Sequence, residues 1–228
     1  MYLVGYLYSR VMHQAEFIVE DDVFDDIEGP VIVVCNHTCG IDPFLVSAII
    51  PRKISWLMAE DMRIKWLGWF WNWAGIIFVA RNRHGKSGIR RARAHLNNDG
   101  MIGIFPEGKI ERPQRQLLPF APGVGVLVKR TGARVLPVVI DGTPDAPTAW
   151  DSIWTSSNAR VRVMKPIDYS TTKLGSAEIA KDLEQRFIEW TGWEMGSRSQ
   201  HQPPADQSPN ESPADDTHPI VDGSRQIA

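Results

Sequence analysis

Short apolar runs alternate with helix-like patterns through most of the chain. The apolar runs are PVIVVCNH, GIIFVAR, GMIGIFPEG, ARVLPVVIDG and ARVRVMKPIDY, and the helical patterns are DPFLVSAII, SGIRRARAHLNN, PGVGVLVKRTG and SAEIAKDLEQRFIEW. Strands that alternate with helices are typical of α/β domains. The pattern therefore predicts an α/β fold with a mostly parallel central sheet flanked by helices.

Polar residues mark the junctions between these strands and helices. Asp42 precedes Pro43 and is predicted to cap one helix, and Ser87 is predicted to cap another that ends at the turn 98–100. Proteins of this class tend to place their sites at such junctions. The strand ends are therefore the first candidates for a functional site.

The two ends of the chain have different patterns. Residues 1–20 carry apolar side chains at helical spacing, namely Leu3, Val4, Leu7, Tyr8, Val11 and Met12. This spacing predicts an amphipathic helix that either associates with a membrane or docks on the core. Residues 197–228 are rich in Pro, Ser, Asp and Gln, which predicts a disordered tail. The domain is expected to span residues 1–196, with its core in 30–140.

Composition narrows the class of protein. The chain has 228 residues, of which 43% are hydrophobic, and its net charge is -2. This length fits one domain with one core, and the balanced charge argues against a surface built to bind nucleic acid. The sequence has neither an apolar run of about 18 residues nor a signal-peptide pattern at its start. We therefore expect neither an exported nor a membrane-spanning protein.

The segment VIVVCNHTCGIDPF holds the first candidate chemistry. An apolar strand runs into Asn36 and His37, and Asp42 follows five residues after the histidine. An imidazole can take a proton from an alcohol near neutral pH, and a carboxylate on its other nitrogen fixes the tautomer. His37 is therefore a candidate base and Asp42 its support. A structural histidine beside a helix cap is the alternative.

Cys35 and Cys39 flank His37 and raise a zinc alternative. Their one-residue gaps to the histidine differ from the C-x2-4-C spacing of common structural sites, so buried thiols are favoured and no metal is predicted. Two cysteines this close are also unlike the disulfide framework of a secreted domain. A reducing, cytosolic compartment is the simpler expectation.

Four segments, NHTCGID, GIIFVAR, IFPEGK and VLPVVI, follow one another in this order within about residues 30–140. Together they resemble the glycerophospholipid acyltransferase family, which includes the bacterial lysophosphatidic acid (1-acylglycerol-3-phosphate) acyltransferases. The resemblance implies an O-acyltransferase of phospholipid biosynthesis. Its N-H-x4-D block implies that His37 is the catalytic base and Asp42 its partner.

The same resemblance implies a substrate-binding set. Its members are Asn36, Arg81, Phe105, Pro106, Glu107, Gly108, Lys109 and Pro137. Arg81 is expected to contact the acceptor's phosphate. Glu107 is expected to accept a hydrogen bond from the acceptor's hydroxyl, with a turn residue as the alternative, and Pro137 is expected near the substrate tunnel.

Basic and aromatic residues near these motifs leave alternatives open. Lys109 stands where the family often has Thr or Ser, and it resembles the tafazzin branch, which exchanges acyl chains between phospholipids. The further basic residues are Arg83, Lys86, Arg90, Arg91 and Arg93, which bind anionic groups or form a solvated face. An aromatic block contains Trp66, Leu67, Trp69, Phe70, Trp71 and Trp73. These side chains cannot all face one interior, so part is expected at a membrane interface and part in the core.

These features predict a direct acyl transfer. His37 takes the proton of the acceptor hydroxyl as it attacks a thioester, backbone donors near the histidine stabilise the oxyanion, and a thiolate leaves. The expected donor is acyl-CoA or an acyl carrier protein thioester, and the expected acceptor is a lysophospholipid such as 1-acylglycerol-3-phosphate, with no cofactor. The protein is expected to lie peripherally on the cytoplasmic face of the membrane. Alternatives are a tafazzin-like transacylase, a lipid hydrolase, a glycerol-3-phosphate acyltransferase and a non-catalytic membrane-binding protein.

Overall fold

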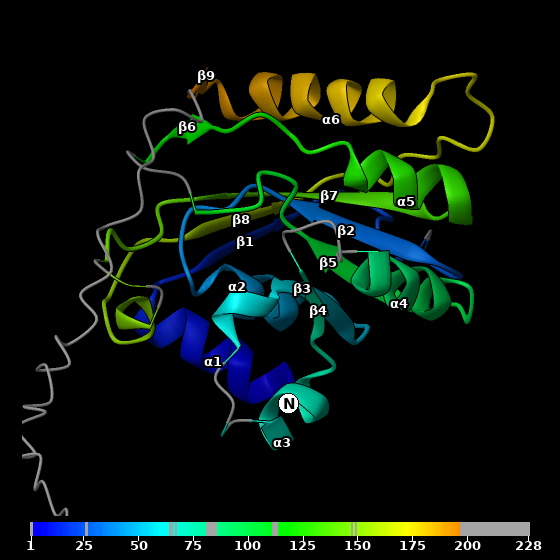
Figure 1. Ribbon diagram of the computed structural model, residues 1–228. Coiled ribbons are helices and arrows are strands. Elements are labelled where there is room, and N and C mark those ends of the chain that lie inside the picture. Colours follow the sequence, from blue (N-terminus) through cyan, green and yellow to red (C-terminus); the bar gives the residue numbers. More distant parts are fainter. Residues whose placement is uncertain are drawn as a thin grey trace, which may run out of the picture.

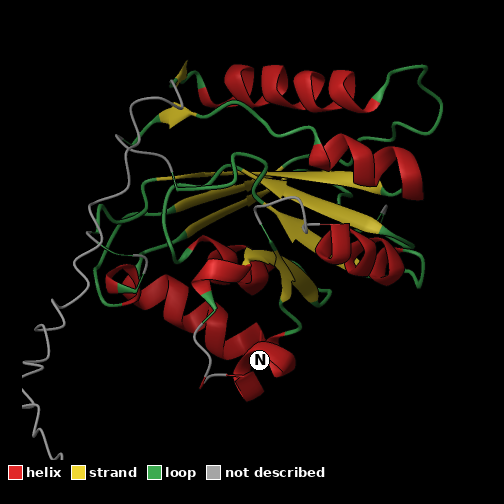
Figure 2. Ribbon diagram, viewed as in Figure 1, coloured by secondary structure: helices red, strands yellow, loops and turns green. Residues whose placement is uncertain are grey.

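A central sheet with helices on both faces organises the chain in the computed structural model (Figure 2). The structure describes residues 2–196 except 26, 64, 65, 67, 81–85, 111–113, 147 and 149. Within this part of the chain the sheet has seven strands in the order β1-β8-β7-β2-β5-β3-β4. Their bounds are β1 Glu16–Val19, β2 Val31–Cys35, β3 Ile54–Ala59, β4 Ile77–Val79, β5 Met101–Ile104, β7 Arg134–Asp141 and β8 Arg160–Val163.

Five neighbouring strands, β7, β2, β5, β3 and β4, run in the same direction, and β8 and β1 run the opposite way. The expected mostly parallel sheet is therefore confirmed. In this register Val33 lies beside Gly103, and Val34 lies beside Pro137. Because parallel strands end at the same edge, the residues that follow β2 and β5 meet there.

Helices cover the two faces of the sheet unequally (Figure 1). Their bounds are α1 Tyr2–Met12, α2 Asp42–Ile49, α3 Gly68–Ala74, α4 Lys86–Leu96, α5 Gly123–Thr131 and α6 Ser176–Thr191. Short 3-10 turns are η1 Glu60–Met62 and η4 Asp151–Ile153, and a small second sheet pairs β6 Gln116–Leu117 with β9 Glu194–Met195. In the view of Figure 1, α1 and α2 lie below the sheet, and α5 and α6 lie above it.

The core consists of two apolar clusters, one on each face of the sheet. Alternate residues of β2 divide between them, with Val33 and Cys35 on the side of α2, and Ile32 and Val34 on the side of α5 and α6. Every residue of β2 is buried, as its uninterrupted apolar run predicted. Burial of each large aliphatic side chain contributes roughly 1.5–3 kcal/mol. Cys39 is also a buried free thiol, so both cysteines serve as small core residues.

Two predicted helix caps are wrong in detail. Asp42 is the first residue of α2, and Ile41 occupies the N-cap position without a side-chain cap hydrogen bond. The carboxylate of Asp42 instead bonds to the preceding turn, which draws it into the site. Ser87 lies inside α4, because this helix begins at Lys86. The sequence pattern also missed β1, β3 and α3, and the predicted tail 197–228 lies outside the described residues.

The N-terminal helix α1 both docks on the core and exposes apolar residues. A Cβ built on Gly5 would lie 3.9 Å from Cβ of Ala48 in α2, and Ser9 is buried. The outer side of α1 exposes Leu3, Val4, Leu7 and Val11. Among the described helices, none combines the length and the apolar character that a membrane crossing requires.

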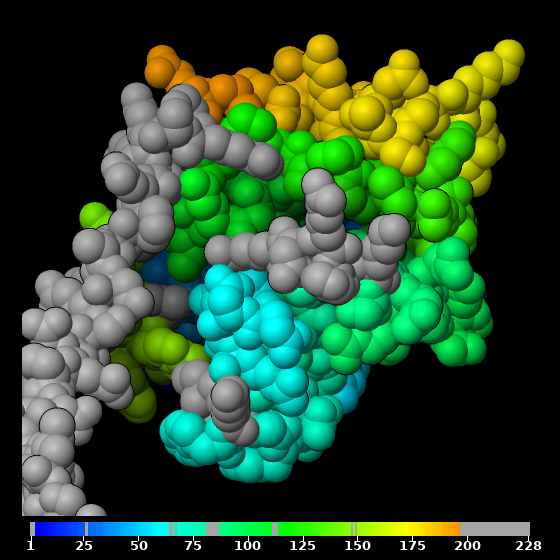
Figure 3. All heavy atoms as spheres, viewed as in Figure 1, coloured from blue at the N-terminus to red at the C-terminus, as the bar shows by residue number. Residues whose placement is uncertain are grey.

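The aromatic block after η1 divides between interior and surface, as expected. Trp71 of α3 is buried and its ring packs against Phe78, with centroids 6.0 Å apart. Trp66, Trp69 and Trp73 are 78%, 71% and 57% exposed. In the space-filling view of Figure 3, the segment around α3 forms the lower end of the coloured part of the molecule.

Candidate active site

His37 follows β2 at the carboxyl edge of the parallel strands, and its imidazole is paired with Asp42. The distance from Nδ1 of His37 to Oδ2 of Asp42 is 2.9 Å, and the two side chains are 15% and 0% exposed. An ionised carboxylate only accepts hydrogen bonds, so the shared proton lies on Nδ1. Nε2 therefore carries a lone pair on the more exposed side of the pair and is able to accept a proton.

The carboxylate of Asp42 is held by the turn that leads into α2. Its Oδ2 accepts hydrogen bonds from the backbone N–H groups of Thr38 and Cys39, at 2.7 and 2.8 Å. Its Oδ1 accepts the hydroxyl of Thr38 at 3.1 Å. These donors compensate the charge of a fully buried carboxylate, which would otherwise be strongly destabilising. Asp42 can thus remain charged and orient the imidazole.

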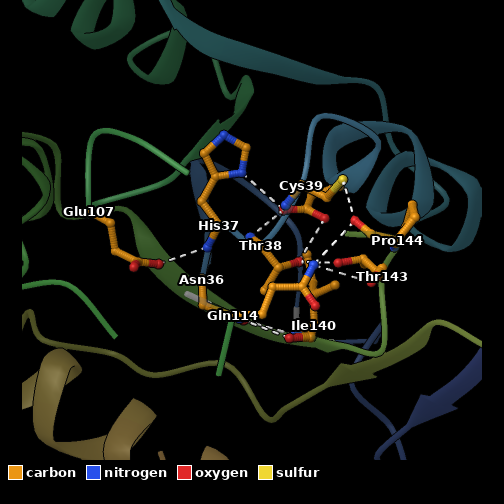
Figure 4. Close-up of polar contacts among 10 residues, drawn as sticks. Asn36, His37, Thr38, Cys39, Glu107, Gln114, Ile140, Thr143 and Pro144 are labelled. Carbon is orange, nitrogen blue, oxygen red and sulfur yellow. Dashed lines mark hydrogen bonds and ion pairs between the residues drawn. The ribbon is translucent and has the colours of Figure 1, made fainter. Parts of the chain in front are cut away.

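Thr38 also connects this turn to the loop after β7. Its hydroxyl lies 2.7 Å from Oγ1 of Thr143, which is buried. Gln114 braces the same loop by donating from Nε2 to the carbonyls of Thr143 and Pro144, at 3.4 and 3.2 Å (Figure 4). The turn before α2, the loop after β7 and Gln114 therefore support the carboxylate of Asp42, although they lie far apart in sequence. The sequence offered no motif for Thr143 or Gln114.

Both carboxyl oxygens of Glu107 are bound to backbone N–H groups. Its Oε1 accepts the backbone N–H of His37 at 2.7 Å, and its Oε2 accepts that of Leu118 at 2.9 Å. Burial raises the pKa of Glu107 to about 8, against the opposite effect of these two hydrogen bonds. Figure 4 shows the carboxylate on the backbone side of His37, with the imidazole pointing away from it. Glu107 therefore positions the strand end, and its hydrogen bond to an acceptor hydroxyl stays a prediction.

Phe105 packs on the face of the His37 ring. The ring centroids lie 4.0 Å apart with an interplanar angle of 18°. Trp56 of β3 stacks on the other side of Phe105 at 4.9 Å and donates from Nε1 to Oγ of Ser47 at 3.0 Å. A Cβ on Gly103 would lie 2.4 Å from the Trp56 ring, so this glycine makes room for the stack. Sequence reasoning missed Trp56, although a glycine inside the apolar run GMIGIF is a signal of a close neighbour that could have indicated the stack.

Asn36 extends the pairing of β2 with β7. Its Nδ2 donates to the carbonyl of Ile140 and its Oδ1 accepts the N–H of Ile140, both at 2.8 Å. The side chain is fully buried. Both ends of the amide are therefore used to fix the strand end that carries His37, and the predicted direct contact of Asn36 with substrate is not supported.

The FPEG block and the residue after it hold three more members of the predicted substrate-binding set. Gly108 has φ +75° and donates to the carbonyl of Phe105 at 3.1 Å, so it forms the tight turn of the FPEG block, with the half-buried Lys109 next to it. Pro106 is buried, and its carbonyl accepts the N–H of Ala121 at 2.8 Å.

Pro137 lies within β7, and Arg81 and Arg83 lie outside the described residues. Pro137 is buried at the centre of the sheet, where its carbonyl accepts the N–H of Met164 at 3.0 Å. The basic side chains described on α4 are exposed, namely Arg90, Arg91 and Arg93. This exposure fits the expected solvated face.

The structure thus brings together His37, Asp42, Phe105 and Glu107 from two parallel strands and one helix. The imidazole, oriented on one nitrogen and stacked on one face, is able to act as a general base through Nε2. Within the described residues, no group of three or more His, Cys, Asp or Glu side chains is arranged to hold a metal ion. The backbone N–H groups of residues 37–39 bond to the two carboxylates, so they are not the expected oxyanion donors.

Comparison with known proteins gives a consistent set of relatives. The chain is 26% identical over 149 residues to "1-acyl-sn-glycerol-3-phosphate acyltransferase alpha" of Homo sapiens, which covers 60% of this chain and 50% of that protein. It is 29% identical over 143 residues to "Taffazin" of Dictyostelium discoideum, covering 55% and 48%. The chain spans about half the length of the curated relatives that it matches.

A solved structure shares the fold. It is the "1-acyl-sn-glycerophosphate (LPA) acyltransferase, PlsC, from Thermotoga maritima", with a TM-score of 0.64, 20% identity, and coverage of 86% of this chain and 80% of that chain. The family model described as "Acyltransferase" matches residues 10–141, which is more than half of the chain and includes both His37 and Asp42. The chain therefore belongs to the acyltransferase family.

Proposed function

We propose that this protein transfers a fatty acyl group from a thioester to a hydroxyl of a lysophospholipid such as 1-acylglycerol-3-phosphate. The observation that carries the proposal is the 2.9 Å pair of His37 and Asp42, which engages Nδ1 and leaves Nε2 of the 15% exposed side chain outside the pair. Several relatives are named 1-acyl-sn-glycerol-3-phosphate acyltransferases, which supports this acceptor. The expected donor is acyl-CoA or an acyl carrier protein thioester.

The reaction follows from the protonation state of the histidine. Nε2 of His37 takes the proton of the acceptor hydroxyl as that oxygen attacks the thioester carbonyl. The resulting imidazolium is stabilised by the charge of Asp42 on its far side. The C–S bond then breaks, and the departing thiolate takes up the proton from the imidazolium, so no further cofactor is needed. Arg81, which follows β4, is proposed to bind the acceptor's phosphate.

Replacement of His37 tests the proposal. With acyl-CoA and 1-acylglycerol-3-phosphate, His37→Ala should lower the rate of thiol release and of formation of the new lipid at least about 100-fold, since a positioned base contributes 10²–10⁴. Both products are measured, the thiol with a chromogenic reagent and the lipid by mass spectrometry. Lys129→Ala, an exposed change on α5, serves as control and should leave the rate unchanged. Full turnover by a folded His37→Ala protein would place the base elsewhere.

A transacylase is the second candidate, because the relative named "Taffazin" is 29% identical over 143 residues. Lys109, directly after the FPEG turn, supports the same candidate by its resemblance to that branch. The two reactions differ in the acyl donor. A purified sample that moves an acyl chain from a phospholipid to a lysophospholipid without any thioester would favour transacylation. Transfer that requires the thioester would favour the first candidate.

We also propose that the protein lies on the cytoplasmic face of a membrane through an aromatic face. This face consists of Leu3, Leu7, Val11, Trp66, Trp69, Trp73, Trp150 and Trp154, all exposed. Figure 1 places α1 and α3 at the same end of the molecule. The segments are also joined by contacts, since Trp71 and Trp150 have ring centroids 6.4 Å apart and the Tyr8 hydroxyl donates to the carbonyl of Ile153. Exposed tryptophans beside aliphatic residues favour a bilayer interface.

Vesicle binding tests the aromatic face. The double variant Trp69→Ser and Trp73→Ser should partition at least about tenfold less onto liposomes, because each large side chain that inserts contributes of the order of 1.5–3 kcal/mol. Co-sedimentation measures the bound fraction. Met195→Ser, on exposed β9, is the matched control and should bind as before. Unchanged binding of the double variant would exclude α3 from the contact.

A further inference from the structure

A cavity lies at the opposite edge of the sheet from His37. Its volume is about 630 Å³, and its lining includes Arg52, Lys53, Asn72, Arg91, His95 and Met101. Most of these residues lie where β3 and β5 begin and where α3 and α4 end, and Arg91 lies in the middle of α4. At 3.3 Å per residue, the four residues of β5 separate the two edges by roughly 13 Å. The cavity is therefore distinct from the candidate active site.

The cations of this cavity bond to uncharged partners. Lys53 Nζ donates to the carbonyl of Trp73 at 3.0 Å, and Arg91 Nη2 donates to the carbonyl of Phe78 at 2.9 Å. The guanidinium of Arg52 is held by three backbone carbonyls, those of Ile27, Gly29 and Asp99. A carbonyl oxygen neutralises no formal charge. These bonds thus fix the positions of the cations without neutralising their charges.

Few carboxylates oppose these charges. Among the described lining residues, Asp99 is the acid, against Arg52, Lys53 and Arg91 as permanent cations. The ion pairs of the described residues involve none of these three cations. In a chain with a net charge of -2, such an excess is local. It favours an anionic ligand.

The same cations retain N–H donors. Arginine has five N–H donors and lysine has three. Arg52 uses three of them on carbonyls, whereas Arg91 and Lys53 use one each. The carbonyl bonds hold the stems in place, and the unused donors suit the several acceptor oxygens of a phosphate. Ile76, Ile77 and Met101 add an apolar wall that fits the carbon part of a phosphate ester.

We propose that this cavity binds a phosphate group, carried either by an anionic phospholipid or by a free phosphate compound. The lipid source rests on the proposed aromatic face, because Asn72 of α3 lines the cavity while Trp69 and Trp73 of the same helix are exposed. When those side chains insert between lipids, the cavity lies beside the layer of headgroup phosphates. Binding of phosphate itself depends neither on that face nor on acyl transfer.

A titration followed by NMR tests the site. Inorganic phosphate added to the ¹⁵N-labelled protein should shift the amide signals of Gly75 and Gly100, which line the cavity, with saturation in the millimolar range. In the double variant Lys53→Gln and Arg91→Gln these shifts should fall at least about fivefold at equal phosphate. Lys53→Arg with Arg91→Lys should keep them, because the charges are conserved. Lys129→Gln with Arg130→Gln, on exposed positions of α5, is the control for a general loss of charge.

The outcomes separate this proposal from the catalytic one. His37→Ala protein should show the same shifts at Gly75 and Gly100, whatever its turnover. Vesicles of phosphatidylglycerol and of phosphatidylcholine distinguish the sources of the phosphate. A preference for the anionic vesicles that the Gln variant loses indicates a lipid headgroup, and phosphate binding without that preference indicates a free compound. Absence of saturable shifts, or equal shifts in a folded Gln variant, would overturn the proposal.

Discussion

Acidic side chains lie at one edge of the parallel strands and basic side chains at the other, and both kinds bond to the backbone. At the carboxyl edge, Asp42 and Glu107 are buried and accept backbone N–H groups. At the amino edge, Arg52 and Lys53 donate to backbone carbonyls. The N–H groups belong to the end of β2, to the turn before α2 and to Leu118, whereas the carbonyl of Trp73 lies in the last turn of α3, where carbonyls lack partners within the helix. Acidic side chains therefore satisfy backbone donors at one edge, and basic side chains satisfy backbone acceptors at the other.

The two edges differ in how many of the hydrogen-bonding atoms of these side chains already have a partner. Asp42 is 0% exposed and Glu107 is 3% exposed, and every oxygen of the two carboxylates has a donor. Lys53 and Arg91 are exposed, and they retain donors after bonding to a carbonyl. Full satisfaction makes the carboxyl edge rigid enough to orient an imidazole. Partial satisfaction leaves the amino edge able to bind a ligand.

The largest expected effect comes from Asp42→Asn, which keeps the shape of the side chain and removes the charge. The amide oxygen can take the position of Oδ2 and accept all three donors, Nδ1 of His37 and the N–H groups of Thr38 and Cys39, while the amide NH2 faces the hydroxyl of Thr38. The imidazolium then loses its counter-charge, so we expect a fall in turnover of about 10²–10⁴, the range of a general base. The initial rate with a soluble short-chain acceptor measures it.

Asp141→Asn is the matched control for this change. Asp141 ends β7 at the same edge but is partly exposed, and its nearest cation is Arg115 at 3.5 Å. We expect its rate to stay within about twofold of the original protein, because exposed ion pairs contribute little. Comparable losses in the two variants would mean that charge in general, and not the pairing with His37, supports the reaction.

The second effect is a dependence of stability on pH through Glu107. Its pKa in the folded protein is about 8, above its ordinary value of 4.5, because of burial. The folded state therefore keeps a proton that the unfolded state releases above about pH 4.5. The free energy of unfolding should fall as the pH rises from about 5 to 8, with a slope of up to about 1.4 kcal/mol per pH unit. Urea denaturation across this range measures the slope.

Glu107→Gln should flatten this slope and lower stability at pH 5. Its amide oxygen satisfies only one of the two N–H groups of His37 and Leu118, and an unsatisfied buried donor costs about 1–3 kcal/mol. Glu189→Gln, an exposed change on α6, is the control and should leave the slope as it was. A slope that persists unchanged in Glu107→Gln would have to arise from another group.

The parts of this architecture that sequence could predict depend on local patterns. The uninterrupted run VIVVC identified β2, because a strand buried on both faces has no polar position. β1, which is half exposed, and α3, which combines an exposed aromatic side with one buried tryptophan, lack such a pattern and were missed. Their position depends on contacts with distant segments, such as the pairing of β1 with β8.

The candidate active site also contains one part that the sequence predicted and one that it did not. The spacing of His37 and Asp42 follows from one turn, so sequence predicted the pair. The identity of Glu107 was also noted, but its partners, the N–H groups of His37 and Leu118, belong to segments 70 and 11 residues away. A resemblance indicates which residues matter and not which atoms they contact. For this reason the sequence did not predict that Glu107 holds the backbone that carries the base.

The smallest expected effect belongs to the amino edge, where Lys53→Met removes the cation at the end of α3. The hydrogen bond from Nζ to the carbonyl of Trp73 is lost, together with the favourable interaction of a cation with a helix C-terminus. We expect a loss of about 1 kcal/mol, confined to α3. Amide exchange of Gly75 and Ile76, whose N–H groups bond to the carbonyls of Asn72 and Trp71, should accelerate about fivefold. Lys181→Met, in the middle of α6, should not change it. If Lys53→Met left this exchange unaltered, the hydrogen bond of Lys53 to the carbonyl of Trp73 would not stabilise the end of α3.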